Sequence, residues 1–200
     1  MTDFLIDGPA DAPWTYAFAH GAGGPMVSGF MNTIARGIAA RGIRVVRFEF
    51  PYMAARRRRP DPEKVILDSW RSVVRELGHL ERLVIGGKSF GGRMASMIAD
   101  EMKVAGLLCY GYPFHPPGQP AKLRTAHLKT LATPATIVQG TRDSFGSREE
   151  VESYELSKSI TIQWIPEGDH SLRPPARSGI TERENLERAV SDGVRFITSF

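Results

Sequence analysis

The chain has 200 residues, 42% of them hydrophobic and 24% charged, which is enough for one domain with its own core and no metal or disulfide staple. Its single cysteine, Cys109, excludes an internal disulfide, and its apolar neighbours indicate a buried thiol in a reducing compartment. The net charge of +4 comes largely from the run Arg56–Arg59, which lacks interleaved aromatic residues, so we expect no nucleic-acid partner.

Targeting and membrane signals are missing from the sequence. The segment 1–9 has no basic region followed by an apolar core, and no apolar run approaches the length needed to cross a bilayer. We therefore expect a cytoplasmic protein that does not contact a membrane. The sequence gives no indication of the oligomeric state.

Apolar runs of strand length alternate with segments of helical period along the whole chain. In chain order, we expect a strand at 15–19, a Gly-rich turn at 20–25, a helix at about 27–41, a strand at 43–50, a loop at 52–61, a helix at 62–77, a strand at 83–85, a helix including 94–99, a strand at 104–110, a short helix near 123–131, a strand at 135–139, a helix from 147, a strand at 160–165 and a final helix from about 181. This order predicts the α/β class, with one doubly wound domain (1–200) around a mostly parallel sheet. The connections are too short for a large lid.

Two helix starts carry recognisable capping signals. Pro62 suits the first helical position, with Asp61 as the N-cap residue. Ser147 is followed three residues later by Glu150, which is the pattern of a capping box.

The segment Gly87-Lys88-Ser89-Phe90-Gly91 lies between an expected strand and an expected helix. A sharp turn from strand to helix would hold Ser89 in a strained conformation above the sheet, with glycines where the backbones approach too closely for a Cβ. This G-x-S-x-G arrangement resembles the nucleophile elbow of the α/β-hydrolase superfamily, in which Ser89 would be the nucleophile. A Gly-rich turn of this kind can also cradle a phosphate on backbone N–H groups.

A serine nucleophile needs a base and an acid, and both are available downstream of Ser89. His170 follows the last strand, at the carboxyl edge where open α/β sheets place their sites, and His115 is its only rival. Asp143 follows the 135–139 strand and is a better acid than Asp169, because adjacent side chains on an extended segment point in opposite directions. The order Ser89, Asp143, His170 is that of the α/β-hydrolases.

Two backbone N–H groups are candidates for an oxyanion hole: that of Phe90, which follows the nucleophile, and that of Ala22 in the Gly-rich turn. The turn also resembles a dinucleotide-binding loop. However, Met26 stands where the G-x-G-x-x-G fingerprint requires its third glycine, so we expect no nucleotide cofactor.

Loop residues at the carboxyl ends of the strands would line the pocket. We expect Met26, Tyr52 and either Phe114 or His115 there, and this apolar and aromatic lining favours a small or medium acyl substrate. No cluster of His, Cys and carboxylates has metal-ligand spacing, so we expect neither a metal nor another cofactor.

Nearly the whole chain is similar to the compact, lid-free α/β-hydrolases of the dienelactone-hydrolase-like group. A narrower resemblance is to an uncharacterised bacterial family related to testis-expressed protein 30 and to a subunit of an animal histone-acetyltransferase complex. The segments that suggest it are FPYM at 50–53, RRRPDP at 57–62, GGKSFGGR at 86–93, GYPFHPPG at 111–118 and QGTRD at 139–143. The resemblance implies a serine hydrolase with no settled substrate, and implies that some relatives act as scaffold subunits.

Two cations near the elbow depart from the usual esterase pattern. Lys88 precedes the nucleophile but cannot face its hydroxyl, which argues against a Ser-Lys dyad. Arg93, one turn into the helix, is either held by a carboxylate or binds an anionic substrate group. The main prediction is a hydrolase of ester, thioester or similar acyl bonds. The alternative is a catalytically silent scaffold that engages a partner through Arg56–Arg59, although we expect these arginines to be surface charge only.

Overall fold

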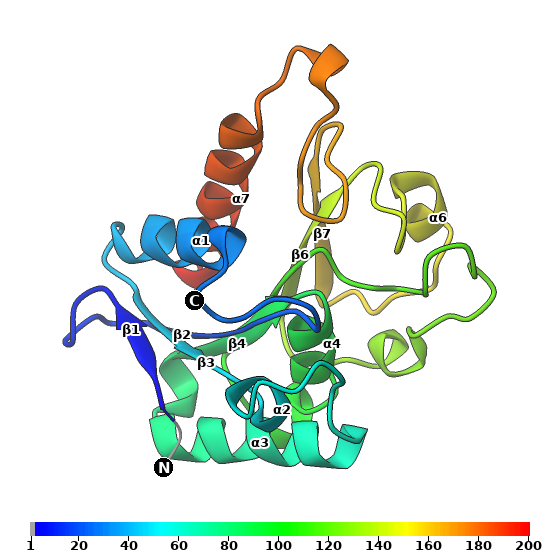
Figure 1. Cartoon of the computed structure of the whole chain (residues 1–200). Coiled ribbons are helices and arrows are strands. Elements are labelled where there is room, and N and C mark those ends of the chain that lie inside the picture. The colour runs from blue at the N-terminus through cyan, green and yellow to red at the C-terminus, as the bar shows by residue number, and fades with distance from the viewer. Residues whose placement is uncertain (1–2) are drawn as a thin grey trace.

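A seven-stranded sheet forms the centre of the molecule (Figure 1). The computed structural model describes residues 3–200, so the first two residues of the segment searched for a signal peptide lie outside it. The strand order is β1-β3-β2-β4-β5-β6-β7; β1 is antiparallel to β3, and the other neighbours are parallel. The strands are β1 Leu5–Asp7, β2 Thr15–Ala19, β3 Arg44–Phe48, β4 Leu83–Lys88, β5 Gly106–Tyr110, β6 Ala135–Gly140 and β7 Ile160–Ile165. The prediction of a single-domain, mostly parallel α/β fold is confirmed.

Helices cover both faces of the sheet, α1 and α7 on one side and α3 and α4 on the other (Figure 1). The helices are α1 Gly29–Ala39, α2 Pro51–Ala54, α3 Glu63–Leu77, α4 Phe90–Ser96, α5 Ala99–Met102, α6 Arg148–Glu152 and α7 Glu182–Ile197, with short 3₁₀ turns at Leu80–Arg82, Ala126–Lys129 and Ala176–Ser178. Because helices cover both faces, every residue of β4, β5 and β6 is buried, and these strands read as continuous apolar runs rather than alternating ones.

Local sequence signals explain where several helices begin. The hydroxyls of Ser147 and Thr181 each accept the backbone N–H three residues on, and the glutamates there return a bond to the cap, so α6 and α7 both start with capping boxes. Within residues 3–200, no helix combines the length and apolar character required to cross a membrane.

Four local expectations differ from the structure. Strand β1 was not predicted, because three half-exposed residues carry little periodic signal. The expected loop after β3 begins with the short helix α2. Asp61 does not cap α3: its carboxylate pairs with Arg57, with nitrogen and oxygen 2.6 Å apart. The helix after the elbow is interrupted between α4 and α5, where the Ser96 hydroxyl donates to the Arg93 carbonyl (2.7 Å) and competes with the helical backbone bonds.

Candidate active site

Ser89 lies at the turn from β4 to α4, as the G-x-S-x-G pattern predicted. Its φ of 50° and ψ of −115° are unusual for a residue with a Cβ, and such strain persists only where the surroundings impose it. The flanking glycines permit the turn: a Cβ on Gly87 would lie 2.5 Å from the carbonyl oxygen of Ala19, and one on Gly91 would lie 2.5 Å from that of His20. The elbow therefore packs directly against the end of β2, and larger residues would force the two apart.

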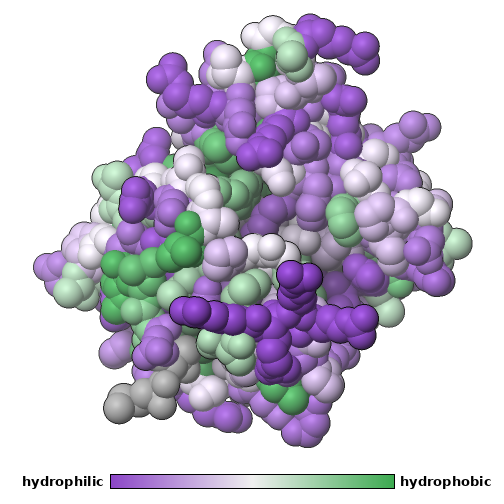
Figure 2. All heavy atoms as spheres, in the orientation of Figure 1, coloured by the Kyte–Doolittle hydropathy of each residue, from purple (hydrophilic) through white to green (hydrophobic). Residues whose placement is uncertain are grey.

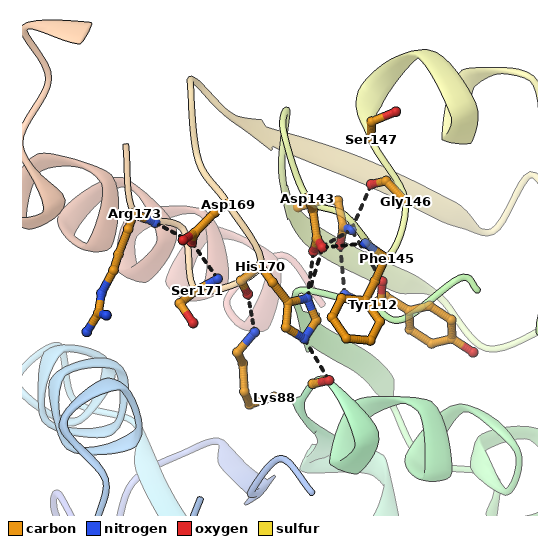
Figure 3. Close-up of polar contacts among 12 residues, drawn as sticks. Lys88, Tyr112, Asp143, Phe145, Gly146, Ser147, Asp169, His170, Ser171 and Arg173 are labelled. Atoms are coloured by element: carbon orange, nitrogen blue, oxygen red, sulfur yellow. Dashed lines mark hydrogen bonds and ion pairs between the residues drawn. The ribbon is translucent and has the colours of Figure 1, made fainter. Parts of the chain in front are cut away.

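The structure brings Ser89, His170 and Asp143 together from three separate loops. Nε2 of His170 lies 2.8 Å from the Ser89 hydroxyl, and Nδ1 lies 2.8 Å and 3.0 Å from the two Asp143 carboxylate oxygens (Figure 3). A carboxylate accepts only, so Nδ1 carries the proton and Nε2 is free to accept the serine proton.

Asp143 is fully buried, yet each of its oxygens has a donor besides His170. The Gln139 amide donates to one oxygen (2.9 Å), and the Phe145 backbone N–H donates to the other (2.8 Å). Gln139 is itself buried on β6 and also donates to the Tyr112 and Gly146 carbonyls. These contacts fix the direction of the carboxylate. Gln139 was not predicted, because a buried glutamine in an apolar strand gives no sequence sign of its partner.

The loop that carries His170 is held by charged neighbours (Figure 3). Asp169 accepts the backbone N–H groups of Ser171 (2.7 Å) and Arg173 (2.9 Å), so it shapes the turn and does not contact the imidazole. Lys88 points away from the serine, as expected, and its ammonium donates to the His170 carbonyl. Gly111 makes this possible, since a Cβ there would lie 2.6 Å from the ammonium nitrogen.

Burial sets the protonation behaviour of the two basic side chains, His170 and Lys88. It lowers the pKa of His170 from its usual value near 6.5; the Asp143 hydrogen bond opposes this shift, and the Lys88 charge adds to it. Burial also lowers the pKa of Lys88, to about 8, against the opposing effect of Asp143 and Asp169. The imidazole is therefore mostly neutral at pH 7, as a general base must be.

Ala22 and Phe90, the two expected oxyanion donors, line the same cavity as Ser89 and His170. Within residues 3–200, neither backbone N–H is used by another group. The turn is fixed from behind: the Tyr52 hydroxyl donates to the Ala22 carbonyl (3.0 Å). His20, which is fully buried, accepts the Phe50 N–H (3.1 Å) through Nε2 and donates to the Gly21 carbonyl (2.7 Å) through Nδ1.

The cavity beside Ser89 has a volume of about 520 Å³. None of the expected pocket residues lines it. Tyr52 is buried beneath the Ala22 turn, and Phe114 lies in the core. His115 is buried against Pro116 and Glu150, while Met26 donates its backbone N–H to Glu49. The expectation failed because these loops fold back onto the core. The side chains at the cavity include those of Phe30, Arg93, Arg124 and Phe145, and the Phe145 ring stacks on His170, with centroids 4.1 Å apart.

A second serine–histidine contact lies near the first. The Ser96 hydroxyl is 2.8 Å from Nε2 of His127 and 3.2 Å from the Tyr112 hydroxyl. Ser96 is only 3% exposed and is the last residue of α4, its φ is not positive, and no described carboxylate hydrogen-bonds to His127. This contact lacks both the strained, partly exposed serine and the acid that Ser89 and His170 have.

The arginine run forms an exposed basic surface beside the site. Hydrophilic side chains gather over α2 and the loop after it (Figure 2). All four arginines are exposed, and Arg57 pairs with Asp61. Cys109 is fully buried, and burial raises the pKa of its thiol. In residues 3–200, no three His, Cys, Asp or Glu side chains are grouped to hold a metal ion.

Comparison with known proteins agrees with this architecture. A family described as an alpha/beta hydrolase domain matches residues 14–198. An α/β serine hydrolase homologue from Coxiella burnetii superposes with a TM-score of 0.75 at 22% identity, covering 96% of this chain and 89% of that chain. An α/β serine hydrolase without a lid, from Xanthomonas campestris, gives a TM-score of 0.72 at 22% identity, with 96% and 88% covered. Est1E from Butyrivibrio proteoclasticus, solved with ferulic acid, gives 0.74 at 14% identity, with 98% and 96% covered. The family match spans most of the sequence, and the chain therefore belongs to the alpha/beta hydrolase domain family.

Proposed function

We propose that this α/β hydrolase is a serine hydrolase that cleaves an ester, thioester or similar acyl bond through Ser89, His170 and Asp143. The observation that carries the proposal is the continuous hydrogen-bonded chain from a strained serine through an imidazole to a buried carboxylate, opening into a cavity.

The chemistry follows from the protonation states. The Ser89 oxygen attacks the acyl carbon while Nε2 of His170 takes the serine proton, and Asp143 stabilises the imidazolium that forms. The oxygen of the tetrahedral intermediate accepts from the Phe90 and Ala22 N–H groups. His170 then returns its proton to the leaving alcohol or thiol. A water molecule repeats the sequence on the acyl-enzyme and releases the acid.

The size of the cavity supports a small or medium substrate. A volume of about 520 Å³ lies in the range of small-molecule sites. We also retain the narrower relationship to the bacterial family related to testis-expressed protein 30 as a proposal, based on the segments quoted above.

Labelling with a fluorophosphonate probe tests the nucleophile. The intact protein should be labelled, and Ser89→Ala should lose all labelling, together with at least about a thousandfold of any esterase activity. Ser96→Ala is the matched control, because it removes the other serine hydroxyl that contacts a histidine. Labelling that persists in Ser89→Ala and disappears in Ser96→Ala would show that Ser96 is the nucleophile and would contradict the proposal.

The scaffold alternative depends on Arg56–Arg59, of which only Arg57 has an ion pair within the described part of the chain. Exposed charges contribute little individually and are screened by salt. We expect Arg57→Ala/Arg58→Ala to change kcat/KM for a neutral ester by less than about twofold at low and high ionic strength. The measurement pairs ester hydrolysis with capture of an acidic peptide. Loss of peptide binding with hydrolysis intact would favour a partner-binding role for this surface.

A further inference from the structure

The Lys and Arg side chains that line the cavity beside the candidate active site have no acidic residue among them. Lys88, Arg93 and Arg124 line the cavity together with Ser89 and His170, whereas none of its described lining residues is Asp or Glu. The hydrogen bond to the His170 carbonyl occupies Lys88. The two arginines are thus the charges available to a ligand.

Arg93 is poorly neutralised within the protein. Its guanidinium reaches Glu63 only at 3.5 Å, the long limit of a hydrogen bond, and that glutamate side chain is about half exposed. Its Nε is buried and has no hydrogen-bond partner among residues 3–200, although the side chain as a whole is 20% exposed. An unsatisfied buried donor on a cation is costly unless some other group completes it.

Arg124 has even less compensation. Its backbone N–H donates to the Phe114 carbonyl (2.7 Å), which anchors the residue at the rim, but its guanidinium forms no hydrogen bond or ion pair within residues 3–200. Both arginines line the same cavity, and burial and the charge of Arg93 lower the pKa of Arg124. An anion between them would relieve both the repulsion and the missing hydrogen bonds.

Arg93 also has a fixed relation to the nucleophile. Its backbone N–H donates to the carbonyl of Ser89, the N-cap residue of α4 (3.0 Å), so Arg93 lies in the first turn of the helix that begins at the nucleophile. Both residues line the same cavity. An anionic group a few bonds from a scissile acyl carbon could therefore reach the guanidiniums while the carbon meets Ser89.

We infer that Arg93 and Arg124 form a subsite for an anionic group, a carboxylate or a phosphate, carried by the substrate close to its scissile acyl bond. The inference rests on the proposed hydrolase function and specifies its substrate class. Planar guanidiniums suit both anions because they donate two parallel hydrogen bonds.

Paired esters test this subsite by pH-stat. Monomethyl glutarate carries a carboxylate on the acyl side, and methyl hexanoate is its neutral counterpart. 3-Acetoxypropanoate carries a carboxylate on the alcohol side, and propyl acetate is its neutral counterpart. In at least one pair, we expect kcat/KM to favour the anionic ester by about tenfold or more, and high ionic strength to reduce this ratio. Arg93→Gln and Arg124→Gln should each reduce the ratio by about tenfold.

Two further variants act as controls. Arg36→Gln removes an exposed charge from α1, away from the cavity, and should leave the ratio unchanged. Glu63→Gln removes the competing carboxylate and should raise the ratio. A ratio near one in both pairs, or a ratio unaltered in both arginine variants, would overturn the inference while leaving the hydrolase proposal intact.

Failure of the hydrolase proposal has a different signature: no ester is cleaved, and the fluorophosphonate probe does not label the protein. In that event, calorimetric titration of the intact protein with glutarate and with inorganic phosphate still decides the subsite. Binding of either anion that is lost in Arg93→Gln supports it and identifies the preferred anion. Absence of binding of both refutes it.

Discussion

Replacing Asp143 with asparagine is expected to reduce kcat/KM for an ester substrate about a thousandfold or more. Asp143 accepts from His170, from the Gln139 amide and from the Phe145 N–H. An asparagine has one acceptor oxygen and one NH₂ group, so its NH₂ group must face at least one of these three donors, with which it cannot form a hydrogen bond. If the NH₂ group faces His170, Nδ1 must give up its proton, and the wrong tautomer then places a proton on Nε2, where Ser89 needs an acceptor.

The Asp143→Asn measurement has a matched control in the same region. Asp169→Asn makes the same chemical change one residue from His170, but a single amide oxygen can still accept both backbone N–H groups that Asp169 binds. We therefore expect less than about tenfold loss in Asp169→Asn. Fluorescence and thermal unfolding should show both variants folded. Similar losses in the two variants would indicate that the loop, and not the orientation of the imidazole, controls activity.

The elements that local chemistry determines could be predicted from the sequence. The elbow needs glycines at 87 and 91, because a Cβ at either position would lie 2.5 Å from a carbonyl oxygen at the end of β2. The five residues of the G-x-S-x-G segment alone indicate this requirement. The ends of β2 and β7 and the capping box of α6 are equally local. The meeting of Ser89, Asp143 and His170 could be predicted because all three follow parallel strands, whose carboxyl ends lie at one edge of the sheet.

The parts that failed depend on which distant segments meet. Tyr52 seemed suited to the pocket, but α2 turns it under the Ala22 turn, and no pattern in residues 50–55 contains that information. Gln139 and Asp143 are four residues apart, yet their contact requires the loop after β6 to fold back on its own strand. The contact between Lys88 and the His170 carbonyl spans 82 positions and also needs the absence of a side chain at Gly111.

Lys88 is the residue for which stability and activity are expected to move in opposite directions. Its pKa falls from 10.5 to about 8 on burial, so the charged form that predominates at pH 7 is disfavoured in the folded protein. A difference of this size corresponds to about 3 kcal/mol, part of which the hydrogen bond to His170 returns. Lys88→Met should therefore raise the free energy of unfolding at pH 7 by about 1–3 kcal/mol, measured by urea denaturation.

The pH dependence of stability separately tests whether Lys88 destabilises the folded protein. Between about pH 8 and 10.5, the unfolded chain binds a proton at Lys88 that the folded chain has lost, so the stability of the unmodified protein should rise with pH in this window. Lys88→Met should lack that contribution.

Activity should change the other way: without the ammonium, the His170 carbonyl loses its donor and the imidazole loses the positive neighbour that lowers its pKa. The acid limb of kcat/KM should then move to higher pH, and kcat should fall as the loop loosens. A variant that is more stable, with an unchanged pH profile, would show that Lys88 supports the fold around His170 without influencing its proton.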